Sequence, residues 1–111
     1  MSWGEAFVWT CVLELPFYWG LLRGRLRWWA PPVVTVGLNA ATHPLLWWLC
    51  VRAPQRIVPC ELAVIAVEGT LVWLLLRRAS VERAAPLAFA ASAAANAFSW
   101  LAGPSIVRAL R

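Results

Sequence analysis

Charged residues are scarce in this chain, and two charged residue types are missing from it altogether. Its 111 residues include no aspartate and no lysine, and only 14% of them are charged. An ordinary soluble domain carries about 25% charged residues. Hydrophobic residues make up 62% of the chain, and nine residues are tryptophans. A fold this small buries too little of its surface to hide so much apolar area from water. The composition therefore predicts a protein of the lipid bilayer.

The sequence also lacks the motifs that usually carry enzyme chemistry. It contains no GxSxG, no HExxH and no glycine-rich phosphate loop, the patterns that position a nucleophile, a catalytic zinc or a nucleotide. Its three cysteines are not in CxxC spacing, which excludes a tetracysteine zinc site. We therefore expect a protein that is not an enzyme. No basic segment precedes Trp3 and no cleavage signature follows the first apolar run, so we expect no cleaved signal peptide.

The net charge of +5 comes from arginines that are grouped at intervals along the chain. All ten basic residues are arginines, and they fall in four clusters, within residues 23–27, 52–56, 77–83 and 108–111. Nucleic-acid binding needs a basic stripe with exposed aromatic residues. Arginines at the ends of apolar runs are instead typical of membrane segments that meet lipid headgroups. The predicted partner is the lipid bilayer, with no nucleic acid.

The arginine clusters divide the chain into four apolar segments, each close to the ~20 residues that a helix needs to cross a bilayer. These segments span residues 5–22, 31–51, 60–76 and 84–107. Pro31 and Pro32 open the second segment, and Pro54 and Pro59 mark the loop before the third. The short linkers make consecutive helices antiparallel neighbours. The sequence predicts one domain over residues 1–111, without an internal repeat: an all-α, integral membrane four-helix bundle with short loops and a polar core.

The arginine distribution also predicts an orientation. The first and third loops together hold six arginines, against four in the second loop and the C-terminal end. The positive-inside rule then predicts a multi-pass protein of the cell inner membrane with both termini outside the cytoplasm. Cys50 and Cys60 bracket the second loop, which this orientation places in an oxidising compartment, so a disulfide between them is compatible with the topology. The alternative is that both cysteines are small apolar fillers.

Helical periodicity collects the polar side chains of each segment on one face. The four faces carry, in chain order, Thr10, Glu14 and Tyr18; Asn39 and His43; Glu61 and Glu68; and Ser92, Asn96 and Ser99. At 1.5 Å per residue, Glu14, Asn39, Glu68 and Ser92 lie about 12–13 Å from the arginine-rich side, and His43 and Asn96 roughly 18–20 Å. We therefore expect Glu14, Asn39, His43, Glu68 and Asn96 to meet near the middle of the membrane.

A lone ionised carboxylate in hydrocarbon costs several kcal/mol or more, so two glutamates and a histidine there need an explanation. Glu14, His43 and Glu68 are the predicted metal or proton ligands, because two carboxylates and one imidazole suit a divalent metal ion as a cofactor or can share a proton. A third solution has neutral carboxyls that only hold the bundle together by hydrogen bonds. Tyr18, Asn39, Ser92, Asn96, Ser99 and Glu61 are the predicted supporting polar residues.

Four stretches, ELPFY (14–18), NAATHPLLWW (39–48), ELAVIAVEG (61–69) and SAAANAFSWLAG (92–103), together resemble a pattern in small bacterial membrane proteins. This uncharacterised family is recognised by its NxxTHPxxW motif, and the resemblance implies four helices and a recurrent polar core. The length, the expected four helices and Glu14 are also similar to small multidrug resistance transporters. That resemblance implies a dimer that exports hydrophobic cations in exchange for protons, although the aromatic residues of the family's third helix have no counterpart around residues 63–68.

These observations favour a membrane protein that binds or translocates a small cation, either a proton or a divalent metal ion. The alternative is a non-catalytic small subunit or assembly factor of a larger membrane complex, in which the polar core is structural. Under either hypothesis we expect the chain to work as a homo-oligomer or with other membrane subunits.

Overall fold

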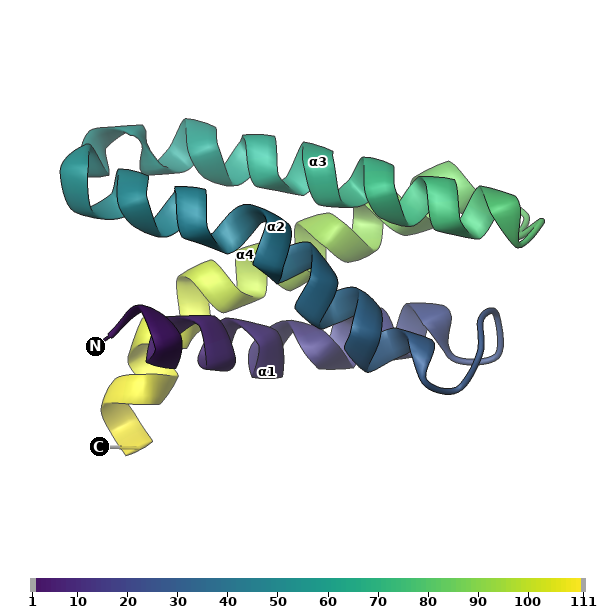
Figure 1. Ribbon diagram of the computed structural model, residues 1–111, viewed down its shortest axis with the longest axis horizontal. Helices are drawn as coiled ribbons and strands as arrows, with labels where there is room; N and C mark the ends of the chain where they lie inside the picture. The colour runs from purple at the N-terminus through teal and green to yellow at the C-terminus, as the bar shows by residue number, and fades with distance from the viewer. Residues whose placement is uncertain (1, 111) are drawn as a thin grey trace.

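Apolar runs separated by short turns fold into helices that pack side by side (Figure 1). The computed structural model describes residues 2–110, without the side chains of Cys50, Val107 and Leu110. Helices account for 87% of the chain, and no strand is formed within the described residues. The elements are α1 (Trp3–Leu22), α2 (Ala30–Arg52), the short 3-10 helix η1 (Pro54–Arg56), α3 (Ile57–Arg78) and α4 (Ala84–Leu110). The predicted all-α four-helix bundle is confirmed.

The helix boundaries follow local chemistry. Ser2 caps α1 through a capping box with Glu5, in which each side chain accepts a backbone N–H of the other residue. Pro31 and Pro32 lie in the first turn of α2, where their missing N–H groups cost nothing. The third helix begins earlier than predicted, at Ile57 rather than residue 60. Pro59 therefore lies inside the first turn of α3 and not in the loop, because a proline is tolerated there for the same reason.

Helices α2 and α4 cross the other two helices instead of running parallel to them (Figure 1). In Figure 1, α1 and α3 lie at opposite edges of the molecule and run in the same direction, while α2 passes in front and α4 behind. Both α2 and α4 run diagonally between the two outer helices. The interior between the four helices is the only place where the polar faces of all of them can meet.

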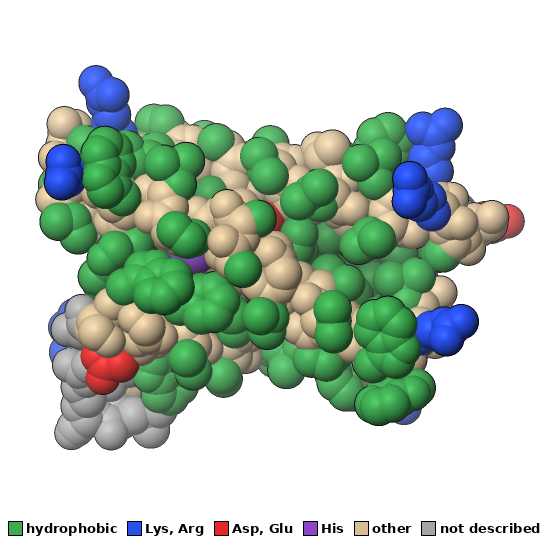
Figure 2. Space-filling view, in the orientation of Figure 1, with side chains coloured by type: hydrophobic (Ala, Val, Ile, Leu, Met, Phe, Trp, Pro, Cys, Tyr) green, Lys and Arg blue, Asp and Glu red, His purple; other side chains and the backbone are tan. Residues whose placement is uncertain are grey.

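Polar side chains are buried in this bundle beside an apolar core. Fully or almost fully buried residues include eight polar ones, namely Glu14, Thr35, Asn39, His43, Glu61, Glu68, Ser92 and Asn96. Leucine, valine, phenylalanine and tryptophan side chains are exposed along all four helices. Figure 2 shows apolar side chains over the middle of one face and arginines at its two ends. Single exposed apolar residues are common, but fully buried carboxyls are not.

Two segments of the described chain are long and apolar enough to cross a membrane. They are Pro54–Arg78, which contains η1 and α3, and Ala84–Ile106, which covers most of α4. The prediction that all four helices cross the membrane is therefore supported by hydropathy for two of them. The other two are richer in residues of intermediate hydropathy, since α1 contains three tryptophans and α2 contains two tryptophans and three prolines.

A close contact between α3 and α4 depends on Gly69. A Cβ atom at this position would lie 2.7 Å from Cε1 of Phe89 and closer still to Cδ1 of the same ring. We expect Gly69→Ala to destabilise the fold by about 1 kcal/mol, because overpacking costs about 1–3 kcal/mol while alanine regains up to about 1 kcal/mol of helix propensity. In a Phe89→Ala background the same substitution should become stabilising.

Thermal unfolding in detergent of the four proteins of this double-mutant cycle measures the effect. Gly37→Ala is the matched control, because no heavy atom lies within 4 Å of its added Cβ, and it should not destabilise. Equal effects of Gly69→Ala in the two backgrounds would mean that the Phe89 ring does not depend on the glycine.

Candidate functional site: two buried carboxyls and a cavity

Two carboxyl groups lie at the centre of the bundle, one on each of the parallel helices α1 and α3. Glu14 and Glu68 both have 0% of their surface exposed. Within residues 2–110, each carboxyl is hydrogen-bonded only to neutral amide and hydroxyl groups. Since no arginine among residues 2–110 reaches either carboxyl, this part of the chain offers no fixed positive charge to balance them.

Glu14 receives its two hydrogen bonds from the two diagonal helices. The Asn39 amide on α2 donates to Oε2 at 2.8 Å, and the Ser99 hydroxyl on α4 lies 2.9 Å from Oε1. The same Asn39 nitrogen donates to the Thr35 carbonyl one turn earlier, at 3.0 Å. An amide nitrogen carries two protons, so both of its donors are used and the orientation of Asn39 is fixed.

Glu68 is surrounded by the same kinds of groups, with one addition. The Asn96 amide on α4 donates to Oε2 at 2.6 Å and to the Ser92 carbonyl at 2.9 Å. The Thr42 hydroxyl on α2 lies 3.0 Å from Oε1. The additional donor is the Tyr18 hydroxyl, 3.1 Å from Oε2. Glu68 thus has three neighbouring donors, where Glu14 has two.

His43 does not join the two carboxyls. Its Nε2 atom lies 3.4 Å from the Thr10 hydroxyl, and its ring meets the Phe7 ring edge-on at a centroid distance of 5.7 Å. Its other nitrogen, Nδ1, is buried and has no hydrogen-bond partner among the described residues. His43 therefore occupies the next level of the bundle, one turn beyond Asn39 and level with Thr10, which precedes Glu14 by one turn.

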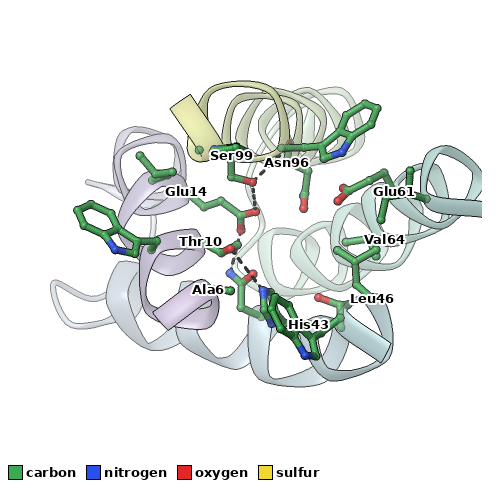
Figure 3. A pocket seen from close by; sticks show the side chains of 18 residues that line it. Ala6, Thr10, Glu14, His43, Leu46, Glu61, Val64, Asn96 and Ser99 are labelled. Atoms are coloured by element: carbon green, nitrogen blue, oxygen red, sulfur yellow. Dashed lines mark hydrogen bonds between the residues drawn. The ribbon is translucent and has the colours of Figure 1, made fainter. Parts of the chain in front are cut away.

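A cavity of about 300 Å³ lies at this level, between all four helices. Glu14 and His43 are among the residues that line it, with Glu61 from α3 and Trp100 from α4. In Figure 3, Glu14, His43 and Glu61 face the same space from three sides. Glu61 is only 7% exposed, and no residue between 2 and 110 forms a hydrogen bond with it. A cavity of this size with several polar groups can hold water. Glu68 does not line it.

The geometry agrees with part of the predicted site. Six of the predicted residues form one hydrogen-bonded cluster: Glu14, Tyr18, Asn39, Glu68, Asn96 and Ser99. Ser92 lies beside the cluster and donates to the Ile65 carbonyl. Glu61 lies in the cavity wall. Sequence reasoning missed Thr42, whose hydroxyl lies near both the Leu38 carbonyl and Glu68. Its position three residues after Asn39, like that of Ser99 after Asn96, is the signal that indicates it.

The structure does not bring the three predicted metal ligands together, and it does not describe both cysteine side chains of the predicted disulfide. Within the described part of the chain, no group of three or more histidine, cysteine or glutamate side chains lies close enough together to hold a metal ion. The reason is that His43 lies one level away from the carboxyls, beside Thr10. Cys60 has a free thiol, and the side chain of Cys50 lies outside the described residues.

Comparison with known proteins does not extend these observations. No protein-family model, no curated protein and no solved structure matches the chain. The geometry of the site is therefore the basis for inferring a function.

Proposed function

We propose that this chain is a multi-pass protein of the inner membrane that binds a small cation, the proton, at its paired buried carboxyls. The membrane part of the proposal is supported by the apolar exterior and by the arginines at both ends of the molecule (Figure 2). The longest dimension of the bundle is 40 Å, which fits a bilayer of about 40–45 Å including its headgroups.

One observation carries the proton-binding part. Each carboxyl presents its Oε1 atom to a hydroxyl that has a second acceptor: Thr42 lies 3.0 Å from the Leu38 carbonyl, and Ser99 lies 3.2 Å from the Asn96 carbonyl. A hydroxyl has one proton and can also accept. When the carboxyl is ionised, the hydroxyl donates to it. When the carboxyl is protonated on Oε1, it donates to the hydroxyl, which then donates to the backbone carbonyl.

The remaining oxygen of each carboxyl fits the same two states. Oε2 of Glu14 and Oε2 of Glu68 each accept an asparagine N–H, and an oxygen in that role stays unprotonated. Each acid can therefore gain or lose one proton at a defined atom without leaving a polar group unpaired. This matters because an unpaired polar group inside the bundle costs about 1–3 kcal/mol. Both protonation states are compatible with one arrangement of the helices.

A proton fits this site better than a divalent metal ion. A metal site needs several ligand atoms converging on one point, and the described residues offer no such group. The cavity beside Glu14 gives protons a route through water, since bridging waters connect polar groups almost as well as direct hydrogen bonds. The chain then acts as a proton-binding or proton-translocating membrane protein, alone as a homo-oligomer or beside other membrane subunits.

One observation favours the structural alternative, a subunit whose polar core only holds the helices together. Glu68 is closed off by three donors and does not reach the cavity. A carboxyl that never exchanges its proton would serve packing alone. The two functions differ in whether the carboxyls titrate in the folded protein.

Infrared spectroscopy of the protein in lipid vesicles tests the proposal, because protonated and ionised carboxyls absorb separately. We expect a protonated-carboxyl signal that decreases as the pH rises, and the loss of a distinct part of it in Glu14→Gln. Glu82→Gln, a change at an exposed position before α4, is the control and should leave the buried signal unchanged. A signal that is the same in wild type and in Glu14→Gln at every pH would favour the structural alternative. Elemental analysis of the same samples checks for bound metal.

A further inference from the structure

The two outer helices, α1 and α3, share a sequence pattern around their buried glutamates. Residues 14–23, ELPFYWGLLR, and residues 68–77, EGTLVWLLLR, are identical at five of ten aligned positions. The shared residues are the glutamate, a tryptophan, two leucines and the arginine that ends the run. Both helices begin eleven residues before the glutamate, at Trp3 and at Ile57. The two glutamates therefore lie at the same level of two parallel helices.

The diagonal helices, α2 and α4, share a second pattern. Residues 35–42, TVGLNAAT, and residues 92–99, SAAANAFS, both have an asparagine with a hydroxyl residue four positions before it and three positions after it. Neither pattern is long enough to indicate a repeat alone. The order glutamate helix, then asparagine helix, occurs twice along the chain, with both patterns in the same order.

The hydrogen bonds repeat in the same way. In each half the asparagine donates to Oε2 of the glutamate of its own half, at 2.8 Å in the first half and 2.6 Å in the second. In each half the hydroxyl three residues later lies near Oε1 of the glutamate of the other half, at 3.0 Å for Thr42 and 2.9 Å for Ser99. Each asparagine also bonds to the carbonyl four residues before it, at 3.0 and 2.9 Å.

The arrangement of the helices agrees with this repetition of the hydrogen bonds. A half-turn about the long horizontal direction of Figure 1 places α1 on α3 and carries α2, in front, onto α4, behind. The diagonal of α2 then coincides in direction with the diagonal of α4. The sequence pattern, the hydrogen bonds and the helix directions therefore obey one two-fold relation.

We infer that the chain is a tandem repeat of one two-helix unit. The level of the bundle that contains Glu14 and Glu68 follows the two-fold relation. The level that contains His43 and Glu61, here called the asymmetric level, departs from it and admits protons to Glu14. The second part of this inference rests on the proposed function. Because each glutamate is bonded to both halves, the two carboxyls form one shared site and not two separate sites. The expectation from sequence that the chain has no internal repeat is thereby revised.

The two-fold relation breaks at the residues that make the cavity polar. His43 in the first half corresponds to Trp100 in the second, and Glu61 in the second corresponds to Phe7 in the first. His43 Nδ1 is also a buried atom of the cavity wall without a hydrogen-bond partner within residues 2–110. Glu61, which is 7% exposed, forms no hydrogen bond within the same residues. The cavity wall thus offers two proton-accepting groups at positions where an exact repeat would place an aromatic ring.

The other ionisable groups around Glu14 are less suited to this role. Glu68 and Tyr18 lie within the hydrogen-bonded cluster, and Cys11 is a half-buried free thiol on the same helix. The residues of α4 that reach Glu14 are neutral. Glu61 and His43 are therefore the ionisable groups that share the cavity with Glu14.

Exchanging two side chains of the apolar core tests the repeat. Tyr18 and Val72 occupy equivalent positions, and both are fully buried in the same apolar cluster. Tyr18→Val and Val72→Tyr should each lower the unfolding temperature in detergent, the first by leaving a void and the second by overpacking. The double variant moves the tyrosine to the equivalent position. Its unfolding temperature should therefore fall by less than half of the sum of the two single decreases. A double variant no more stable than the sum of the two single changes would overturn the repeat.

A rate measurement tests the asymmetric level. After a pH jump, the protonation of Glu14 is followed by infrared spectroscopy in wild type, His43→Phe, Glu61→Gln and the double variant. The double variant should slow proton exchange about a hundredfold, the usual contribution of positioned acid–base groups, without removing the signal. Trp100→Phe, at the equivalent of His43, is the matched control and should leave the rate unchanged. Unchanged rates in the double variant would overturn this assignment, whereas absence of any Glu14 titration would overturn the proposed function itself.

Discussion

Replacing Val67 by aspartate is expected to cost about 2.5–3.5 kcal/mol of stability in the membrane, although the position is exposed. Val67 lies in the middle of the apolar segment Pro54–Arg78 and is 48% exposed. Its neighbour Glu68 is fully buried and has three hydrogen-bond donors. The carboxylate introduced by Val67→Asp would instead face the lipid, where it has no hydrogen-bond donor. In water the exposed carboxylate at position 67 would cost less than the buried carboxylate of Glu68, because the solvent solvates it.

The measurement is the fraction of protein recovered in the membrane and its unfolding temperature in lipid. Ala79→Asp is the matched control, because Ala79 is exposed immediately after the end of α3, where water or headgroups are available. We expect the control to change stability by less than about 0.5 kcal/mol, as surface substitutions usually do. If Val67→Asp is as harmless as Ala79→Asp, the exterior of the bundle faces water, and the membrane part of the proposed function is wrong.

The level of the two glutamates could be predicted from sequence, because it depends on counting along a helix. Glu14 precedes Arg23 by nine residues and Glu68 precedes Arg77 by nine. Helical spacing also places Tyr18 one turn after Glu14, and Asn39 and Asn96 on the polar faces of their helices. These residues meet in the structure because a buried carboxyl has few alternatives to neutral donors at the same level.

Counting places His43 about one turn from the glutamates, but it cannot predict which side chains this residue meets. Counting from the arginine-rich end assumes that helices run parallel to a common axis, whereas α2 crosses α1 and α3 diagonally (Figure 1). A diagonal helix advances less along that axis per residue and also changes its neighbours from turn to turn. His43 therefore meets Thr10 and Phe7 on α1 instead of the carboxyls. Crossing angles depend on the packing of side chains between helices, which a single helix pattern does not contain.

Thr42 illustrates a different limit. A helical threonine usually satisfies its hydroxyl on the carbonyl one turn earlier, and Thr42 does so with Leu38. The sequence does not indicate that the same oxygen also faces Glu68 on another helix. Only the second copy of the pattern, in which Ser99 follows Asn96 by three residues and faces Glu14, shows that this position is part of the site. A repeat within one chain thus supplies information that an isolated motif lacks.

Replacing Asn96 by leucine is the second change expected to have a large effect, because it removes a donor without removing volume. Asn96 is 4% exposed, and its amide lies 2.6 Å from Glu68, the shortest hydrogen bond of the cluster. The substitution leaves Oε2 of Glu68 with the Tyr18 hydroxyl alone and leaves the Ser92 carbonyl without its amide donor. We expect a loss of about 1–3 kcal/mol in the free energy of unfolding, the usual cost of an unsatisfied buried group.

Asn39→Leu is the comparison that the repeat provides. Its amide makes the equivalent bonds to Glu14 and to the Thr35 carbonyl, so an exact two-fold site would give equal losses. Glu14 differs from Glu68 because it lines the cavity, where a water molecule can replace the missing donor. The loss should therefore be smaller for Asn39→Leu than for Asn96→Leu, as measured by chemical unfolding in mixed micelles. Thr70→Val, at an exposed threonine bonded only to its own helix, should have little effect. The opposite order of the two asparagine variants would mean that water does not reach Glu14, and that the cavity does not serve this carboxyl.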